Sequence, residues 1–283
     1  MTNATIIPIE LQLDDGKKIQ IASDAVEELT LKGLGIGEVD LEEFVRRNIE
    51  VLFLDSDETL LIVGQQTRNQ QGGRSDLVAV DGDGNIVLIE LKRDKEDMVA
   101  RKEPFEFQAI SYAANYALVE SPQDLVQKLF ASYVEKHQNS AEFREELEKG
   151  LTASEVASKV LDDFLDDNQA RRTFNRYQRI ILMASSFDPQ TLSAGAWLAQ
   201  NGIDIRCIEV SPIKYGQRYF FRVEQTIPPP ELDQYFVGID EPKESTRKRS
   251  GGTRRTLPRM PRLFEWNLID QGDEVHIRGH EPK

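Results

Sequence analysis

The feature that most restricts the fold is a pair of apolar runs, SDLVAVD (75–81) and NIVLIELK (85–92), separated by Gly82-Asp83-Gly84. Both runs are short and rich in β-branched residues, and a glycine-flanked connection of this kind is typical of a hairpin turn. Apolar side chains occupy both faces of the two expected strands, so both faces need to be covered. The pattern predicts a hairpin in the interior of a sheet that carries helices on its two sides.

A polar cluster is expected at the open end of this hairpin. With the turn at residues 82–84, Asp76 lies opposite Glu90, and Lys92 shares the face of Glu90 because strand side chains repeat every two residues. Two adjacent carboxylates repel each other unless a cation lies between them. Oxygen ligands suit Mg²⁺ or Mn²⁺, and a neighbouring lysine can orient water or stabilise charge on a phosphate oxygen. These residue types therefore indicate hydrolysis of a phosphodiester.

The rest of the chain alternates strands and helices. Asp40 is expected to cap a helix over about 41–53, with Glu43 completing a capping box. Residues 178–210 have the pattern of a βαβ unit, whose two strands should be parallel. The other predicted elements are short strands within 4–31, strands over 59–67 and 218–227, a helix over about 105–119, and charged amphipathic helices over about 122–170. The predicted fold class is α/β, a mixed central β-sheet flanked by helices, with a helical insertion.

The domain organisation follows from these patterns. An N-terminal β element over 1–38 precedes a main domain over 39–240, which contains the helical insertion at about 122–170. Residues 241–262 form a basic segment with Pro, Gly and Ser that is typical of an exposed linker. Residues 263–283 resume an apolar pattern but are too short to bury a core of their own.

The hairpin and its flanks resemble a known family of enzymes. The residues that carry the resemblance are Ser75-Asp76, Glu90-Leu91-Lys92, the preceding Gly72-Gly73-Arg74, the following Arg93, and the helix QAISYAANYA at 108–117. Together they resemble the PD-(D/E)XK nuclease superfamily, and more closely the nuclease domain of the NucS-like endonucleases. Ser75 stands where the family pattern has proline. The resemblance covers about residues 40–120 well and extends weakly to about 230.

The resemblance implies a restriction-endonuclease-like fold and a metal-dependent nuclease. Asp76 and Glu90 would be metal ligands for Mg²⁺ (or Mn²⁺), and Lys92 would be catalytic. DNA would be the substrate, with RNA left open. The last residues of the chain, from Met260, resemble the start of a small restriction-enzyme and adenine-methylase associated module, which this chain would contain only in part.

Two further residues are implied as members of the site. Such nucleases commonly add a glutamate from the helix before the sheet, and helix geometry favours Glu42, which lies at the edge of the apolar stripe, over Glu43, which points away. The alternative explanation is that both are solvated helix carboxylates. Gln108 shares a helix face with Tyr112 and would support the site, although a buried glutamine bonded to the backbone explains it as well.

Charge is distributed unevenly along the chain. The net charge is −14, which by itself argues against a nucleic-acid partner. Residues 1–167 carry 17 basic and 35 acidic side chains, however, whereas residues 168–283 carry 18 basic and 14 acidic ones. The candidates for DNA contacts are Arg74 and Arg93, which flank the expected metal site, and the cluster of Arg171, Arg172, Arg176 and Arg179. The alternative for the cluster at 171–179 is that these arginines form a solvated face of a helix.

Several other functions are disfavoured or left open. No apolar run approaches the length of a membrane span and the N-terminus lacks the pattern of a signal peptide, so the protein is expected to be cytoplasmic, without membrane contact. The oligomeric state stays open, a homodimer included. The alternative to a nuclease is a non-catalytic nucleic-acid-binding module on a decayed nuclease fold, although such a module has no chemical reason to keep a lysine beside two carboxylates.

Overall fold

The computed structural model describes a defined part of the chain, residues 9–12, 18–21, 26–53, 58–68, 74–99 and 104–228. The chain divides into two units, residues 1–248 and residues 249–283, and every described residue belongs to the first. The predicted linker over 241–262 and the C-terminal module over 263–283 therefore lie outside the described residues.

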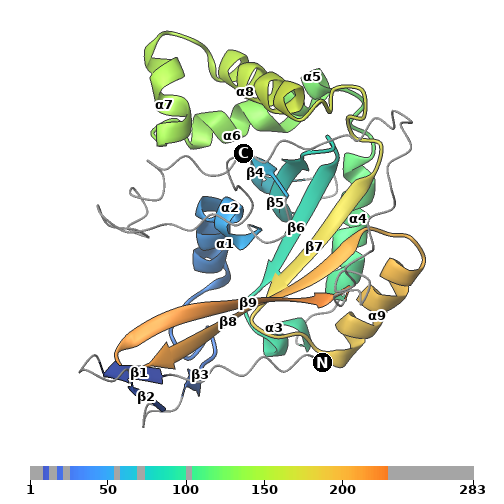
Figure 1. Ribbon diagram of the computed structural model, residues 1–283. Helices are drawn as coiled ribbons and strands as arrows, with labels where there is room; N and C mark the ends of the chain where they lie inside the picture. Colours follow the sequence, from blue (N-terminus) through green and yellow to red (C-terminus); the bar gives the residue numbers. More distant parts are fainter. Residues whose placement is uncertain are drawn as a thin grey trace, which may run out of the picture. The chain divides into compact units, whose positions relative to one another are not determined.

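The first unit is built on a mixed seven-stranded sheet (Figure 1). Its strands are β3 (Glu27–Glu28), β4 (Leu60–Arg68), β5 (Arg74–Asp81), β6 (Ile86–Lys92), β7 (Gln178–Ala184), β8 (Ile205–Tyr215) and β9 (Arg218–Ile227). They run in the order β3-β8-β7-β6-β5-β4, and β9 also pairs with β8. The β4–β5 and β5–β6 pairs are antiparallel, whereas the β6–β7 and β7–β8 pairs are parallel. Strands β3 and β9 both pair antiparallel with β8. The predicted class and the parallel βαβ unit are confirmed.

Two further strands, β1 (Ile9–Gln12) and β2 (Lys18–Ile21), form an antiparallel pair of their own. They agree with the short strands predicted within residues 4–31. Strand β3, from the same part of the sequence, pairs instead with the end of β8, so that Glu28 lies opposite Ile213. The N-terminal part of the chain thus contributes one strand to the main sheet.

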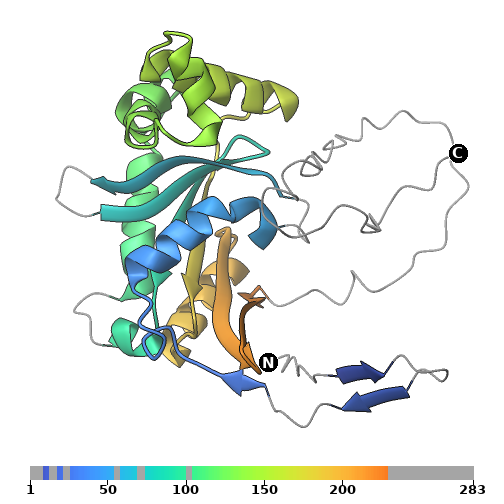
Figure 2. The same ribbon diagram turned by 90° about the vertical axis from the view of Figure 1, so that its left-hand side faces the viewer.

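Helices cover both faces of the sheet, as predicted (Figure 2). They are α1 (Glu38–Arg47), α2 (Ile49–Leu52), α3 (Lys95–Val99), α4 (Phe105–Tyr116) and α9 (Pro189–Gln200). Val45 of α1 belongs to the core cluster that contains Ile89, whereas Phe105 of α4 belongs to the cluster that contains Leu88. Because neighbouring residues of a strand point to opposite faces, α1 and α4 lie on opposite sides of β6. Helix α3 was not predicted, and α4 ends at Tyr116 rather than at 119.

The helical insertion lies along the β4 edge of the sheet. Its elements are α5 (Pro122–Leu125), η2 (Val126–Phe130), α6 (Ala131–Lys136), α7 (Ala141–Glu148) and α8 (Ala153–Asp167). A Cβ added to Gly64 of β4 would come within 2.7 Å of the Leu129 side chain, so the two elements pack closely. In the part of the chain that is described, none of the helices has the length and apolar character that a membrane crossing requires.

Helix α1 differs from its prediction in both its start and its length. Gly37 is the N-cap, and its backbone N–H donates to Asp40 Oδ2 at 2.8 Å. Asp40 therefore acts from inside the first turn and is not the cap, because an extended glycine already serves as the cap residue. The helix ends at Arg47, with Asn48 as its C-cap, so the predicted single helix over 41–53 is two helices. The prediction of Asp40 as the cap was wrong.

Glu43 also has another partner than the predicted capping box. Its carboxylate accepts hydrogen bonds from Arg46 Nε at 2.7 Å and Arg47 Nε at 2.6 Å, which hold the pKa of Glu43 down to about 2. Arg46 in turn donates to the Tyr133 hydroxyl in the insertion at 3.2 Å. Glu43 thus helps to dock the insertion onto α1, and Gln65 of β4 also donates to its carboxylate at 3.5 Å, so it reaches the sheet as well.

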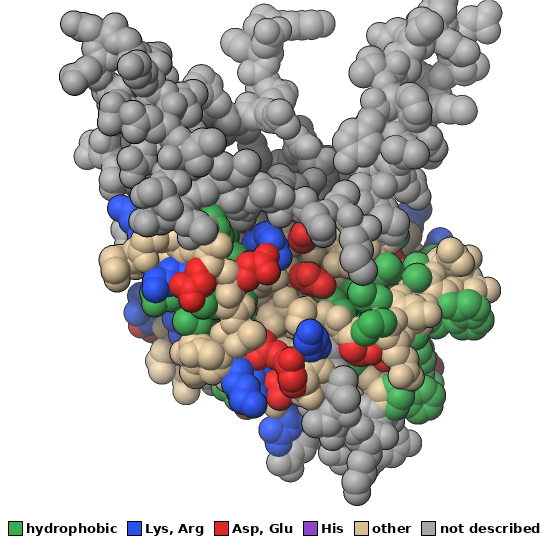
Figure 3. Space-filling view, turned by 90° about the horizontal axis from the view of Figure 1, so that it is seen from below, with side chains coloured by type: hydrophobic (Ala, Val, Ile, Leu, Met, Phe, Trp, Pro, Cys, Tyr) green, Lys and Arg blue, Asp and Glu red, His purple; other side chains and the backbone are tan. Residues whose placement is uncertain are grey.

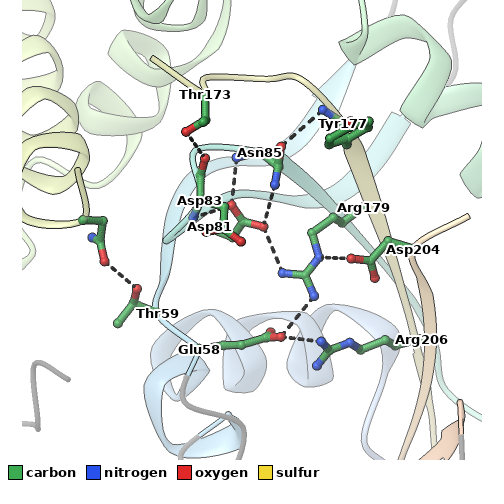
Figure 4. A network of polar contacts seen from close by, with 11 residues as sticks. Glu58, Thr59, Asp81, Asp83, Asn85, Thr173, Tyr177, Arg179, Asp204 and Arg206 are labelled. Carbon is green, nitrogen blue, oxygen red and sulfur yellow. Dashed lines mark hydrogen bonds and ion pairs between the residues drawn. The ribbon is translucent and has the colours of Figure 1, made fainter. Parts of the chain in front are cut away.

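Ion pairs join the closed end of the hairpin to β7 and β8 (Figure 4). Arg179 of β7, whose side chain is 8% exposed, donates to Asp204 Oδ2 at 2.7 Å, to Asp81 Oδ2 at 2.9 Å and to Glu58 Oε1 at 3.1 Å. Glu58 also pairs with Arg206. The structure therefore places Arg179, a sequence candidate for DNA contact, in an interior network that ties four segments together.

Candidate active site

The open ends of β5 and β6 bring the predicted polar residues together. The register is the predicted one, with Leu77 opposite Ile89 as the last pair of the ladder toward the open end. Beyond that pair, Lys92 Nζ lies 3.8 Å from Glu90 Oε1 and 4.0 Å from Asp76 Oδ2. Three chemically active side chains thus lie at one place in the fold.

Lys92 is buried despite its charge, with 1% of the residue exposed. Its Nζ donates to the carbonyl oxygen of Leu91 at 2.5 Å and lies 3.9 Å from Glu38 Oε1 of α1. The same nitrogen lies 5.1 Å from the centroid of the Phe105 ring. A buried ammonium group is costly unless anionic groups compensate it. The surrounding carboxylates provide that compensation and fix the position of the ammonium group.

Glu42 approaches the same place from α1. Helix geometry predicted that it faces the sheet, and it is only 2% exposed. Gln66 of β4 donates from Nε2 to Glu42 Oε2 and also to Asp76 Oδ1, the second at 3.3 Å. Burial raises the pKa of Glu42, against the opposing hydrogen bonds from Gln66 and Gln65. Within the described residues, Glu42 Oε1 is buried without a hydrogen-bond partner.

Gln66 is the member of this site that the sequence did not reveal. Its φ is 54°, in the left-handed region that residues other than glycine rarely adopt. The register of β4 on β5 also shifts between Ile62 and Gly64, just before it. A bulge of this kind redirects side chains, and strained backbone positions cluster at functional sites. The available signal was Gly64-Gln65-Gln66, a glycine and two amides inside an otherwise apolar strand.

Helix α4 supports the backbone that leads into Asp76. The Tyr112 hydroxyl accepts the backbone N–H of Arg74 at 2.9 Å and a hydrogen bond from Gln108 Nε2 at 3.2 Å. The hydroxyl groups of Ser75 and Tyr116 lie 2.7 Å apart, and Ser75 is buried. Gln108 therefore contacts Tyr112, which bonds to the strand that carries Asp76, and Ser75 has a hydrogen-bond partner in Tyr116.

The two arginines that flank the site differ in their surroundings. Arg74 is exposed, and its Nη1 donates to Gln66 Oε1 at 3.1 Å, which connects it to the amide between Glu42 and Asp76. Arg93 is held by Asp97, with Nε 2.9 Å from Asp97 Oδ2. Acidic and basic side chains lie intermixed on the face seen in Figure 3. Arg74 is therefore the better placed of the two for a phosphate.

The arginine cluster at 171–176 lies at the other end of the hairpin. Its loop bonds to the β5–β6 turn, where Asn175 N donates to Gly84 O at 2.8 Å. Arg171 pairs with Asp162 and Asp166, whereas Arg172 and Arg176 are exposed. The turn and the carboxylates are separated by the length of β6, roughly 20 Å at the usual rise of a strand. The structure does not bring these three arginines to the site.

The donor set suits a hard divalent cation by its chemistry. Glu42, Asp76 and Glu90 offer carboxylate oxygens, and the buried Glu42 Oε1 lacks a partner within the described residues. Across those same residues, no group of three or more His, Cys, Asp or Glu side chains is arranged to hold a metal ion. Mg²⁺ commonly takes only one or two protein carboxylates and keeps its waters. The residues present therefore fit such an ion as a two-carboxylate site.

Comparisons with known proteins give little beyond this geometry. No protein-family model matches the chain, and no curated protein matches it. A search of solved structures finds an EndoMS–dsDNA2 complex with 18% sequence identity and a TM-score of 0.27, over 72% of this chain and 65% of that chain. The match thus spans less than two thirds of the other chain. At this TM-score the likeness assigns neither an activity nor a ligand to the protein.

Proposed function

We propose that the protein is a Mg²⁺- or Mn²⁺-dependent endonuclease that hydrolyses DNA phosphodiester bonds, a member of the PD-(D/E)XK superfamily. The observation that carries the proposal is the buried Lys92 ammonium, within 4.0 Å of both Asp76 and Glu90 at the ends of two neighbouring strands. The sequence resemblance, which rests on Ser75-Asp76 and Glu90-Leu91-Lys92, supports the same assignment. The resemblance also favours DNA over RNA as the substrate.

The acidic residues would hold the metal ion. Asp76 and Glu90 would be its ligands, with Glu42 as a third carboxylate beside them. When bound, a divalent cation of this class polarises a phosphoryl oxygen and supplies a nucleophilic water at neutral pH. It would also compensate the negative charge that Glu42, Asp76 and Glu90 bring to one small region.

Lys92 and Arg74 would act on the substrate. The Lys92 ammonium is fixed by Glu38, Asp76 and Glu90, so it can face negative charge that develops on a phosphate oxygen without first being ordered. The Arg74 guanidinium is exposed beside the site and can donate to a neighbouring phosphate. Its bond to Gln66 Oε1 would keep it within reach of the carboxylates.

The test is direct. Purified protein is incubated with labelled single-stranded, duplex and branched DNA, and with RNA, in the presence of Mg²⁺, Mn²⁺ or EDTA. We expect cleavage of DNA with either metal and none with EDTA. Binding without cleavage under all conditions would favour the alternative, a non-catalytic nucleic-acid-binding module.

Replacing Lys92 with Ala is expected to lower the cleavage rate by about 10²-fold or more, since one preorganised charge contact in a transition state typically contributes that much. Stability is expected to fall as well, because the buried Glu90 would lose a charged partner 3.8 Å away. Rates are therefore measured well below the melting temperature of the variant. Lys95→Ala, at an exposed lysine on α3, is the control and should cleave normally. A Lys92→Ala protein with the normal rate would remove Lys92 from the mechanism.

Replacing Gln66 with Gly is expected to weaken Mn²⁺ binding and slow cleavage, while the melting temperature holds or rises. Glycine adopts a φ of 54° freely, so the loss of the amide is offset by relief of backbone strain of about 1 kcal/mol. The matched control is Gln169→Gly, at an exposed residue with a φ of 57°. It should gain stability without any change in metal binding. Calorimetric titration with Mn²⁺ and thermal melting measure the two effects, and unchanged Mn²⁺ affinity in Gln66→Gly would show that the amide positions nothing.

A further inference from the structure

The two edges of the main sheet differ in what packs against them. The β4 edge lies under the helical insertion, where Leu129 packs on Gly64. At the other side, β9 is ten residues long and, among the described strands, pairs only with β8. Figures 1 and 2 show β9 in orange at that side of the sheet. An edge strand of this length, with one partner among the described strands, is a ready template for another strand.

The side chains of β9 are unusually apolar for such an edge. Tyr219 is 58% exposed, Phe220 48% and Val223 40%. Natural edge strands are usually short or carry charges that prevent pairing. Tyr219 and Val223 share one face of the strand and Phe220 lies on the other, so exposed apolar side chains flank this edge on both faces of the sheet. Their exposure favours a partner at this edge.

We propose that β9 pairs antiparallel with β9 of a second copy of this chain, centred on Phe221, and joins two sheets into one. The geometry of the β8–β9 hairpin permits pairing centred on Phe221. Tyr215 pairs with Arg218 across a two-residue turn, and backbone groups alternate in direction along an antiparallel strand. The N–H and C=O groups of Tyr219, Phe221 and Val223 therefore point away from β8, toward a partner strand.

The side chains select this register over its neighbours. With Phe221 opposite itself, Arg218 of each copy lies opposite Glu224 of the other, and Tyr219 lies opposite Val223. A two-fold axis makes each of these pairs occur twice. Opposite charges and an aromatic–β-branched pair are favourable across a ladder. The charge pattern of the strand is thus complementary to itself.

The adjacent registers place like charges together. A centre at Phe220 would put Arg218 opposite Arg222, and a centre at Arg222 would put that residue opposite itself. Like charges directly opposite each other are unfavourable in a sheet. Both alternatives also lose the contact between Arg218 and Glu224. A centre at Val223 would pair Arg222 with Glu224 but would leave Arg218 without an opposite charge, so the centre at Phe221 is the one that uses Arg218.

The charges within one copy also favour the pairing of Arg218 with Glu224 of a second copy. Glu224 of β9 lies opposite Glu209 of β8, so the β8–β9 pair already holds two like charges side by side. The pKa of Glu209 is raised by burial and, further down in size, by Glu224. Arg222 of the same strand offsets part of this negative charge, since it lowers the pKa of Glu209. Arg218 of a second copy would bring a further arginine to the outer side of Glu224.

The test uses charge reversal in the full 283-residue chain. Sedimentation velocity from low to high micromolar concentration should show a monomer–dimer equilibrium. Arg218→Glu and Glu224→Arg should each weaken dimerisation by about tenfold, because each change creates two like-charge pairs per dimer. The double variant Arg218→Glu/Glu224→Arg should restore it. Arg172→Glu, the same change at an exposed arginine outside β9, is the control and should leave the equilibrium unchanged.

Three outcomes would overturn the proposal. They are a monomer at every concentration, a dimer that neither single variant weakens, and a double variant that stays as weak as the single ones. A monomer whose β9 is protected in hydrogen exchange would show that another segment of the same chain covers the edge. Circular dichroism verifies that each variant is folded, and none of these outcomes depends on whether the protein is a nuclease.

Discussion

Glu90→Gln is expected to abolish metal-dependent cleavage while the protein stays folded. The change removes a proposed metal ligand and one negative charge, but it keeps the shape of a side chain that is only 1% exposed. Lys92 retains Glu38 and Asp76 within 4.0 Å. Because one of several neighbouring carboxylates becomes neutral, the melting temperature should stay the same or rise. Asp76→Asn should lose cleavage in the same way.

Three measurements separate the roles in this prediction: cleavage of labelled DNA, calorimetric titration with Mn²⁺, and thermal melting. Glu96→Gln is the control, since Glu96 is an exposed glutamate of α3 and is not a proposed ligand. It should retain metal binding and cleavage. If Glu90→Gln and Asp76→Asn were both strongly destabilised, the carboxylates would serve the fold, with Lys92 as their structural counter-ion. Normal cleavage by Glu90→Gln would exclude it as a ligand.

Arg179→Met should cost about 3 to 5 kcal/mol of the free energy of unfolding, the usual effect of removing one partner from a buried ion pair. The carboxylate of Asp81 would remain in the interior, and it also accepts the backbone N–H groups of Asp83 and Asn85 in the turn (Figure 4). Glu58 would keep only Arg206 of its two arginine partners. Denaturation in urea measures the loss.

The control for Arg179 is Arg206→Met, which removes a partly exposed arginine with one partner in the network, Glu58. It should cost much less. The double variant Arg179→Met/Asp81→Asn should recover part of the stability, because no buried charge is then left uncompensated at that position. An Arg179→Met protein of normal stability that binds DNA less tightly would instead support the role in DNA contact considered from the sequence.

The sequence by itself determined the centre of the fold and the site. The register of β5 on β6 follows from a short turn and a period of two, which are both local properties of the chain. That register alone brings Asp76, Glu90 and Lys92 together, as the structure shows. The direction of Glu42 followed in the same way from the period of a helix. Local periodicity is sufficient wherever a residue's position depends on its own element.

Only the tertiary structure decided which partner each polar side chain takes. Glu43 could cap a helix or pair with arginines, and the packing of the insertion on α1 selected Arg46. Arg179 lies in an arginine-rich stretch that is typical of a DNA contact. In the structure, however, it forms ion pairs with Asp81, Glu58 and Asp204 from three other segments. Gln66 enters the site through a bulge and a strained φ that no periodic pattern encodes. Partners distant in sequence compete for the same groups, and only the assembled sheet and helices determine which of them is near enough to bond.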